Sequence, residues 1–387
     1  MKQIFLTFIF YCVLIGTVHA ETSQYGNWTQ AGPVPPFGPR AFYGSAVFHD
    51  QIFVIGGQNT GPRTPDPESY AIYNDVWSTT DGTNWTELTA NASFSQRTDP
   101  RVAVFNDKLW VIGGYSVSSL RNDVWSSSDG RNWSLVTANA DFSPRSDPVV
   151  VVFDNKLWVI GGQDYQSNLV NDVWFSSDGS NWVLITDNAG FSRSLGYILS
   201  GTVFDNHIFI FDVIPNKESW GTNAVWSSSD GKMWTVVNSN ATFRVMKYKP
   251  MTVSNGRFWI IGGGNPGIRG TPEMTTHPEK YVYFNSVWSS VDGISWTLET
   301  EHAGFSPRYG MGVISFQNKI WVLGGFPNAV DVWYLPLLTL TSSNVPSTSN
   351  PSVSGTSART TIGSIFPVLS LVIVAGICAY CSRAGKR

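Results

Sequence analysis

The chain has 387 residues, of which 14% are charged and 14% aromatic, with 17 Trp and 36 Gly. So many large side chains with so few charges exclude a disordered chain, because the aromatic residues need burial. Five of the 25 Lys and Arg residues lie at the two ends, which leaves 20 cations against 28 Asp and Glu between them, a net charge of about −8. An acidic middle without basic runs argues against nucleic acid as a partner.

Residues 1–20 are typical of a secretory signal peptide. Lys2 precedes an apolar run from Ile4 to Ile15, and Val18-His19-Ala20 resembles a small-residue cleavage site. The alternative is an N-terminal membrane anchor, for which the apolar run is short.

Residues 21–335 contain one sequence motif repeated six times. Its clearest copy is VFNDKLWVIGG followed by NDVWSSSDGRNWSLVTANADFSPR, over residues 104–145. Three aromatic registers account for 16 of the 17 Trp. The registers are Trp77, Trp125, Trp174, Trp226, Trp288 and Trp333; Trp28, Trp85, Trp133, Trp182, Trp234 and Trp296; and Phe53, Trp110, Trp158, Phe209, Trp259 and Trp321. A regular period of about 50 residues predicts stacked supersecondary units.

Each unit predicts four short strands. The first turns through residues such as Asn106-Asp107 into a second strand, LWVIGG, whose apolar character on both faces suits a sheet packed between neighbours. The third strand, NDVWSS, reaches an Asp-Gly hairpin, and the fourth begins at the following Trp. Four-stranded sheets around an axis form a propeller, so we expect an all-β fold with six blades.

The ends of the repeat predict how the ring closes. The sixth copy stops after its third strand, whereas Trp28 belongs to a fourth strand without a blade. We therefore expect Asn27–Ala31 to pair with Asp331–Leu335 and complete blade six. An open solenoid, the alternative, would leave both terminal strands as exposed edges.

The Gly-Gly ending of the second strand, the downstream aromatic residue and the Trp before the fourth strand resemble the Kelch repeats of the galactose oxidase-like propeller superfamily. The resemblance covers residues 27–335 and implies a fold more than a function. Two departures stand out. Ser-Ser-Asp-Gly replaces the usual Tyr-Asp, and blade four has Asp212-Val213 in place of Gly-Gly.

The resemblance also implies a binding end of the central channel. Four arginines share one position, 13 residues before the aromatic residue of the second strand: Arg40, Arg97, Arg145 and Arg308. In Kelch propellers the residues just after this position face the ligand, and here they are Phe42, Asp99, Asp147 and Gly310. We expect Asp99 and Asp147, on adjacent blades, to receive a cation or sugar hydroxyls, with the four arginines beside them. The competing interpretation is that these Arg and Asp residues pair within the blade connections and only brace them.

Two long insertions are a second candidate site. Gln58–Tyr73 in blade one and Asn265–Phe284 in blade five flank blade six on one face, and long loops on a rigid scaffold commonly carry binding. Tyr70, Arg269 and Tyr281 are the side chains best suited to anchor a ligand, because aromatic residues and Arg bury much area. Neutral drift of surface loops is the alternative.

Enzymatic interpretations have less support. A copper site like that of galactose oxidase needs a Cys–Tyr crosslink, and residues 21–335 contain no Cys. No clustered histidines and no nucleophile–base pair occur at a recognisable spacing, so we expect no metal and no cofactor. A carbohydrate-active enzyme with funnel Arg and carboxylate groups remains the alternative to a binding protein.

Beyond the repeat, residues 336–361 are rich in Ser, Thr, Pro and Asn and predict an extended stalk. Residues 362–380 lack charges, and ~1.5 Å per residue gives a helix of ~28 Å, close to the ~30 Å hydrocarbon core. The basic tail 381–387 favours a type I orientation with the propeller outside. The alternative is a lipid-anchor signal, which is removed from the mature protein.

Five sequons fit a secretory route: Asn27, Asn84, Asn91, Asn132 and Asn240. Together these features predict a single-pass glycoprotein of the plasma membrane. Its propeller would be a non-enzymatic binding module for an extracellular protein or glycan. The sequence does not indicate an oligomeric state.

Overall fold

The computed structural model describes residues 25–61, 71–166, 168–191, 200–214, 222–243, 246, 248–264 and 282–338. The predicted signal peptide, transmembrane helix and tail lie outside this part of the chain, as does all but the first three residues of the predicted stalk. The described residues form strands and no helix, and none of them belongs to a helix that could span a membrane. The account that follows concerns the unit that ends at Leu340.

Six antiparallel sheets form the fold, as the sequence predicts, and five of them follow chain order from the innermost to the outermost strand. Blade one contains β3 (Gly44–Phe48), β4 (Gln51–Asn59), β5 (Ile72–Thr79) and β6 (Thr86–Thr89); blade two contains β8 (Arg101–Phe105), β9 (Lys108–Ser116), β10 (Ser119–Ser127) and β11 (Ser134–Thr137); blade three contains β12 (Val149–Phe153), β13 (Lys156–Gln163), β14 (Leu169–Ser176) and β15 (Val183–Thr186).

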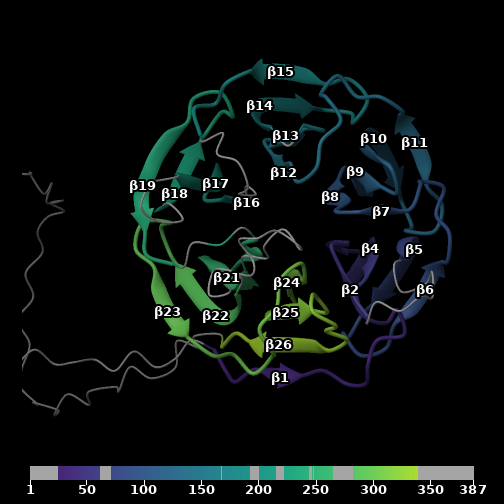
Figure 1. The fold of residues 1–387 in the computed structure, drawn as a ribbon, viewed down its shortest axis with the longest axis vertical. Helices are drawn as coiled ribbons and strands as arrows, with labels where there is room; N and C mark the ends of the chain where they lie inside the picture. Colours follow the sequence, from purple (N-terminus) through teal and green to yellow (C-terminus); the bar gives the residue numbers. More distant parts are fainter. Residues whose placement is uncertain are drawn as a thin grey trace, which may run out of the picture. The chain divides into compact units, whose positions relative to one another are not determined.

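Blade four contains β16 (Ser200–Phe204), β17 (His207–Ile214), β18 (Thr222–Ser228) and β19 (Thr235–Ala241); blade five contains β20 (Met251–Ser254), β21 (Arg257–Gly264), β22 (Tyr283–Ser290) and β23 (Thr297–Thr300). The innermost strands contact one another in a closed cycle, and Figure 1 shows the sheets arranged around a central axis. Two short strands, β2 (Arg40–Ala41) and β7 (Arg97–Thr98), pair with the far ends of β4 and β9.

Blade six closes the ring with both ends of the repeat, as predicted. It contains β24 (Gly312–Phe316), β25 (Lys319–Leu323) and β26 (Val332–Pro336), and its outer strand is β1 (Thr29–Gln30). Thr29 pairs with Tyr334 and Gln30 with Trp333. Figure 1 shows β1 running beside β26 on the outside of the ring. This pairing removes the open edge that a solenoid would leave.

The core lies between the blades. Each Trp that precedes a fourth strand packs edge-to-face on a Phe from the connection before it, as in the pair Trp182–Phe142, whose ring centroids are 5.0 Å apart. Trp28 makes the same contact with Phe305 at 5.0 Å, so the N-terminal strand packs like its five counterparts. Such aromatic pairs stabilise the interface beyond the area they bury.

Blade four differs from blades one, two, three and five where it lacks Gly-Gly. In those four blades the pairing of the second and third strands shifts at the glycines, as between Ile261 and Gly263. In blade four Asp212 pairs with Ala224 and Val213 with Asn223, without a shift. The glycines adopt positive φ, such as 102° at Gly263, which Val would rarely adopt. The bulge therefore depends on Gly-Gly, and blade four continues as a regular ladder.

Candidate functional site

The four arginines predicted to face the ligand lie inside the blades. Arg97 donates hydrogen bonds of 2.8 Å from its two terminal nitrogens to the two carboxylate oxygens of Asp123. It also donates to the carbonyl of Gly113 at 2.8 Å and to that of Ser95 at 3.0 Å. Asp123 in turn accepts the indole N–H of Trp125 at 2.8 Å. We call this arrangement the Arg–Asp clasp.

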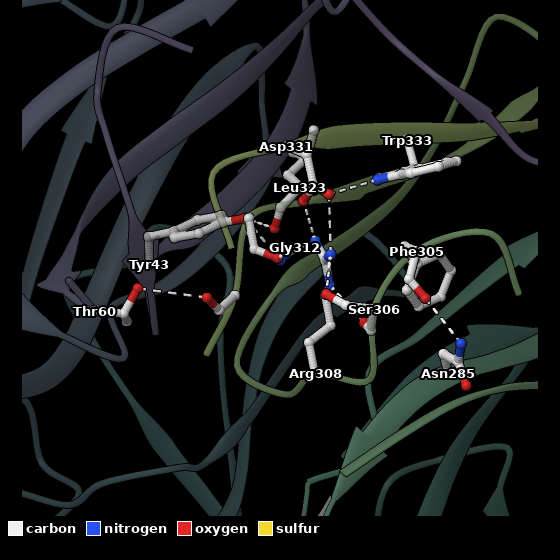
Figure 2. A network of polar contacts seen from close by, with 12 residues as sticks. Tyr43, Thr60, Asn285, Phe305, Ser306, Arg308, Gly312, Leu323, Asp331 and Trp333 are labelled. Carbon is white, nitrogen blue, oxygen red and sulfur yellow. Dashed lines mark hydrogen bonds and ion pairs between the residues drawn. The ribbon is translucent and has the colours of Figure 1, made fainter. Parts of the chain in front are cut away.

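The clasp recurs in four blades, through the pairs Arg40–Asp75, Arg97–Asp123, Arg145–Asp172 and Arg308–Asp331. Figure 2 shows that of blade six, in which Asp331 accepts from both Arg308 and the indole of Trp333. Beside it, the Tyr43 hydroxyl accepts from the amide of Gly312 at 2.9 Å and donates to a carbonyl of β25, which joins blade one to blade six.

The expectation that Arg40, Arg97, Arg145 and Arg308 contact a ligand is therefore corrected. Their side chains are 0–2% exposed, and none of the four lines the central cavity. Each guanidinium is held by a carboxylate and by a glycine carbonyl of the same blade. The bracing interpretation describes these arginines, although their partners are the Asp residues of the third strands and not Asp99 or Asp147.

Blades four and five lack the clasp aspartate. Ala224 and Ser286 stand at the positions of Asp75 and its equivalents. As a consequence, the buried indole nitrogens of Trp226 and Trp288 have no hydrogen-bond partner among the described residues, and neither has the Ser286 hydroxyl. The arginines of these two connections, at positions 193 and 244, lie outside the described residues.

The clasps fix the residues that line the mouth of the channel. Two residues after the clasp arginines, Phe42, Asp99 and Asp147 have φ of 55°, 50° and 54°, and Gly310 has φ of 65°. All four line a cavity of about 270 Å³ in the channel, as predicted for the residues after the arginines. The innermost strands begin here, and the second strands end and the third strands begin at the same end of the channel.

Three further residues at the mouth were not identified from the sequence: Arg101, Tyr248 and Lys249. A signal for one of them was present, since Lys249-Pro250 precedes its innermost strand as Asp99-Pro100 and Asp147-Pro148 precede theirs. The missing clasp of blade five hid this alignment. Lys249 is buried, donates to the carbonyl of Met246 at 2.9 Å, and has its pKa lowered to about 8 by burial.

The charged wall of the mouth lies on blades two and three. Arg101 pairs with Asp147 at 3.0 Å, with the Arg101 side chain 29% exposed. No hydrogen bond or ion pair joins the Asp99 carboxyl to another described residue. Asp99 is surrounded by protein yet partly open to the channel. Loss of hydration, together with the charge of Asp147, raises its pKa to about 8 despite the opposing charge of Arg101.

An aromatic wall faces the charged one from blades five, six and one. Phe42, Tyr248 and Tyr309 form a triangle with ring centroids 5.1–5.6 Å apart. Tyr283 stacks on Tyr309 at 5.1 Å and extends this wall. Burial raises the pKa of Tyr248, and the charges of Asp147 and Asp99 raise it further, so its hydroxyl stays protonated. The mouth thus combines aromatic rings with several charged groups.

The remaining predicted residues are placed only in part. Tyr70, Arg269 and Tyr281 lie outside the described residues. The sequon residues Asn27, Asn84, Asn91, Asn132 and Asn240 are all exposed, and Asn84 and Asn132 donate from their side-chain amides to the aspartates of their hairpins. Among the described residues no three His, Cys, Asp or Glu side chains are grouped so that they could hold a metal ion.

A ring of six four-stranded sheets, second strands ending in Gly-Gly and a cavity at one mouth define a Kelch-type propeller. The family model described as the KLHDC2/KLHL20/DRC7 Kelch-repeats domain matches residues 16–212, about half of the chain. The chain therefore belongs to this Kelch-repeat family. A comparison with curated proteins finds no match. The matched range ends at Asp212, where blade four departs from Gly-Gly.

Proposed function

We propose that the chain is a non-enzymatic binding module that holds a segment of an extracellular protein over the mouth of its channel. The family suggests a protein-interaction module. The observation that carries the proposal is the cavity between the charged wall, with Asp99, Arg101 and Asp147, and the aromatic wall, with Phe42 and Tyr248. The clasps of blades one, two and three hold the backbone two residues before Phe42, Asp99 and Asp147, and a site that is already organised binds at a lower entropic cost.

A screen on intact cells tests this proposal. Cells that express the full chain are probed with multimerised extracellular protein domains and, in parallel, with a glycan array. We expect protein ligands to bind the wild type and to bind Asp147→Asn and Tyr248→Ala at least tenfold more weakly, at equal surface expression. Asp205→Asn, in an exposed turn at the other end of the channel, is the control. Binding of glycans alone would contradict the proposal, as would protein ligands that bind the mouth variants as tightly as the wild type. Turnover of a glycan would favour the alternative of a carbohydrate-active enzyme.

The location is part of the same proposal. It is supported by the signal-like residues 1–20, the sequons and the uncharged stretch 362–380. We expect the full chain to be glycosylated at the plasma membrane and to stay with cells after treatment with a phosphoinositide-specific phospholipase. Release by that enzyme would show that the lipid-anchor alternative is correct.

A further inference from the structure

One carboxyl group at the mouth, that of Asp99, has no direct partner among the described residues. Of the two cations there, Arg101 is paired with Asp147, and Lys249 is buried against the carbonyl of Met246. Asp99 lines the same cavity without an ion-pair or hydrogen-bond partner among the described residues. A carboxyl group in such a place loses hydration that nothing in the described structure replaces. A cationic group that entered the cavity would therefore supply the direct partner that the Asp99 carboxylate lacks.

The neighbours of Asp99 favour a cation as well. The backbone amide of Asp99 donates to the carbonyl of Phe42 at 2.7 Å, and both residues line the cavity. The Phe42 ring lies 5.6 Å from the ring of Tyr248. The faces of aromatic rings attract ammonium and guanidinium groups. An anion would instead meet the Asp99 carboxylate, the negative ring faces and two cations that are already engaged.

The size of the cavity restricts the ligand further. Its volume of about 270 Å³ lies just below the ~300–1,000 Å³ typical of small-molecule sites. A single long side chain suits this volume better than an oligosaccharide. The middle of the chain also carries a net charge of about −8, which attracts basic partners over distance.

We propose that the mouth receives one basic side chain of the protein ligand, a lysine or an arginine, between Asp99 and the rings of Phe42 and Tyr248. This inference rests on the proposed function and names the group that the site recognises. The groups that face Asp99 are Asp147, Arg101 and the Tyr248 hydroxyl. Because the cation binds the ionised carboxylate, a raised pKa at Asp99 makes binding stronger as the pH rises from 6.5 to 8.5.

Peptides with a single variable residue test the inference. The full chain in detergent micelles is titrated into fluorescein-labelled Ser-Gly-Lys-Gly-Ser peptide, with norleucine or glutamate in place of lysine as matched probes, and anisotropy is recorded. We expect the lysine peptide to bind at least tenfold more tightly than the norleucine peptide at pH 8.5. Asp99→Asn, which keeps the size and tolerates positive φ, should remove that preference, whereas Asp205→Asn, also at positive φ, should keep it.

Equal affinity for lysine and norleucine would overturn the inference, as would preference for glutamate or no binding of the lysine peptide at millimolar concentration. An unchanged preference in Asp99→Asn would also overturn it. A different result would reject the proposed function: capture of a protein ligand by cells that does not depend on Asp147 or Tyr248. Capture that needs the mouth but shows no lysine preference would leave the proposed function in place and reject the basic side chain.

Discussion

At the scale of single residues, the Arg–Asp clasp explains why Arg and Asp recur at fixed positions in blades one, two, three and six. A buried guanidinium that meets a carboxylate through two hydrogen bonds is well compensated, but removing one partner leaves the other charge buried. Burial would raise the pKa of Asp123, but the hydrogen bond and charge of Arg97, with the indole of Trp125, outweigh it and lower that pKa. The clasp is thus an electrostatic brace that positions the mouth.

Breaking one clasp should destabilise the ring. We expect Arg97→Met to lower the free energy of unfolding by about 3 kcal/mol at pH 7, because Asp123 loses its buried partner. Since the folded pKa of Asp123 lies below its unfolded value, the clasp stabilises above about pH 4 and loses its effect as the pH falls through the lower folded pKa. Urea denaturation followed by Trp fluorescence at pH 7 and at lower pH measures both effects. A loss below 1 kcal/mol at pH 7, or one independent of pH, would contradict this role.

Sequence reasoning found the arginines but not their partners. The Asp of NDVW lies 23–35 residues beyond its Arg, and only the fold shows that the two meet. The spacing did indicate that Asp99 and Asp147 lie at the channel, since each follows a clasp arginine by two residues and both line the cavity. Tyr248 and Arg101 were missed because the corresponding positions of the other repeats do not carry a recurring polar residue.

At the scale of the element, the Asp-Gly hairpin is what lets blades stack. Gly179 has φ of 77°, and an added Cβ would lie 2.1 Å from the ring of Trp110 in the preceding blade. Gly82 and Gly231 meet Trp321 and Trp158 at the same distance. The hairpin itself is held by Asp178, whose pKa the amide and side chain of Asn181 lower to about 2. The glycine serves packing as well as the turn.

A pair of glycine variants separates the two effects. Gly190 has φ of 84°, and no atom of the described residues lies within 4 Å of an added Cβ, so Gly190→Ala should cost only the left-handed conformation, about 1–2 kcal/mol. Gly179→Ala has the same cost and also forces Trp110 to move, which should add about 1–3 kcal/mol. Equal losses of unfolding free energy for the two variants would show that packing on Trp110 does not matter.

Most of the strands and turns could be predicted, because each weak sequence pattern recurs in the six copies of the repeat. The four strands, the hairpins and the pairing of β1 with β26 all follow from aligned Trp and Asp-Gly positions. The short strands β2 and β7 could not be predicted, because each is only two residues long and consists of the clasp arginine and the residue after it.

At the scale of the whole molecule, the ring is regular in its core and asymmetric at its mouth. Charged residues of blades two and three face aromatic residues of blades five, six and one, and blades four and five lack the clasp aspartate. Tight packing around the ring leaves few ways for the mouth to rearrange, so a ligand meets side chains that are already in position. This arrangement supports binding at one end of the channel.

Site-specific photo-crosslinking tests the central claim most directly. Benzoyl-phenylalanine replaces Phe42 at the mouth or Gln317 in an exposed turn at the opposite end, and cells that display the full chain are irradiated with bound protein ligand. Binding at the mouth predicts a crosslinked ligand from position 42 and none from position 317. Crosslinking from position 317 alone, at equal expression and ligand capture, would show that the ligand binds elsewhere on the propeller.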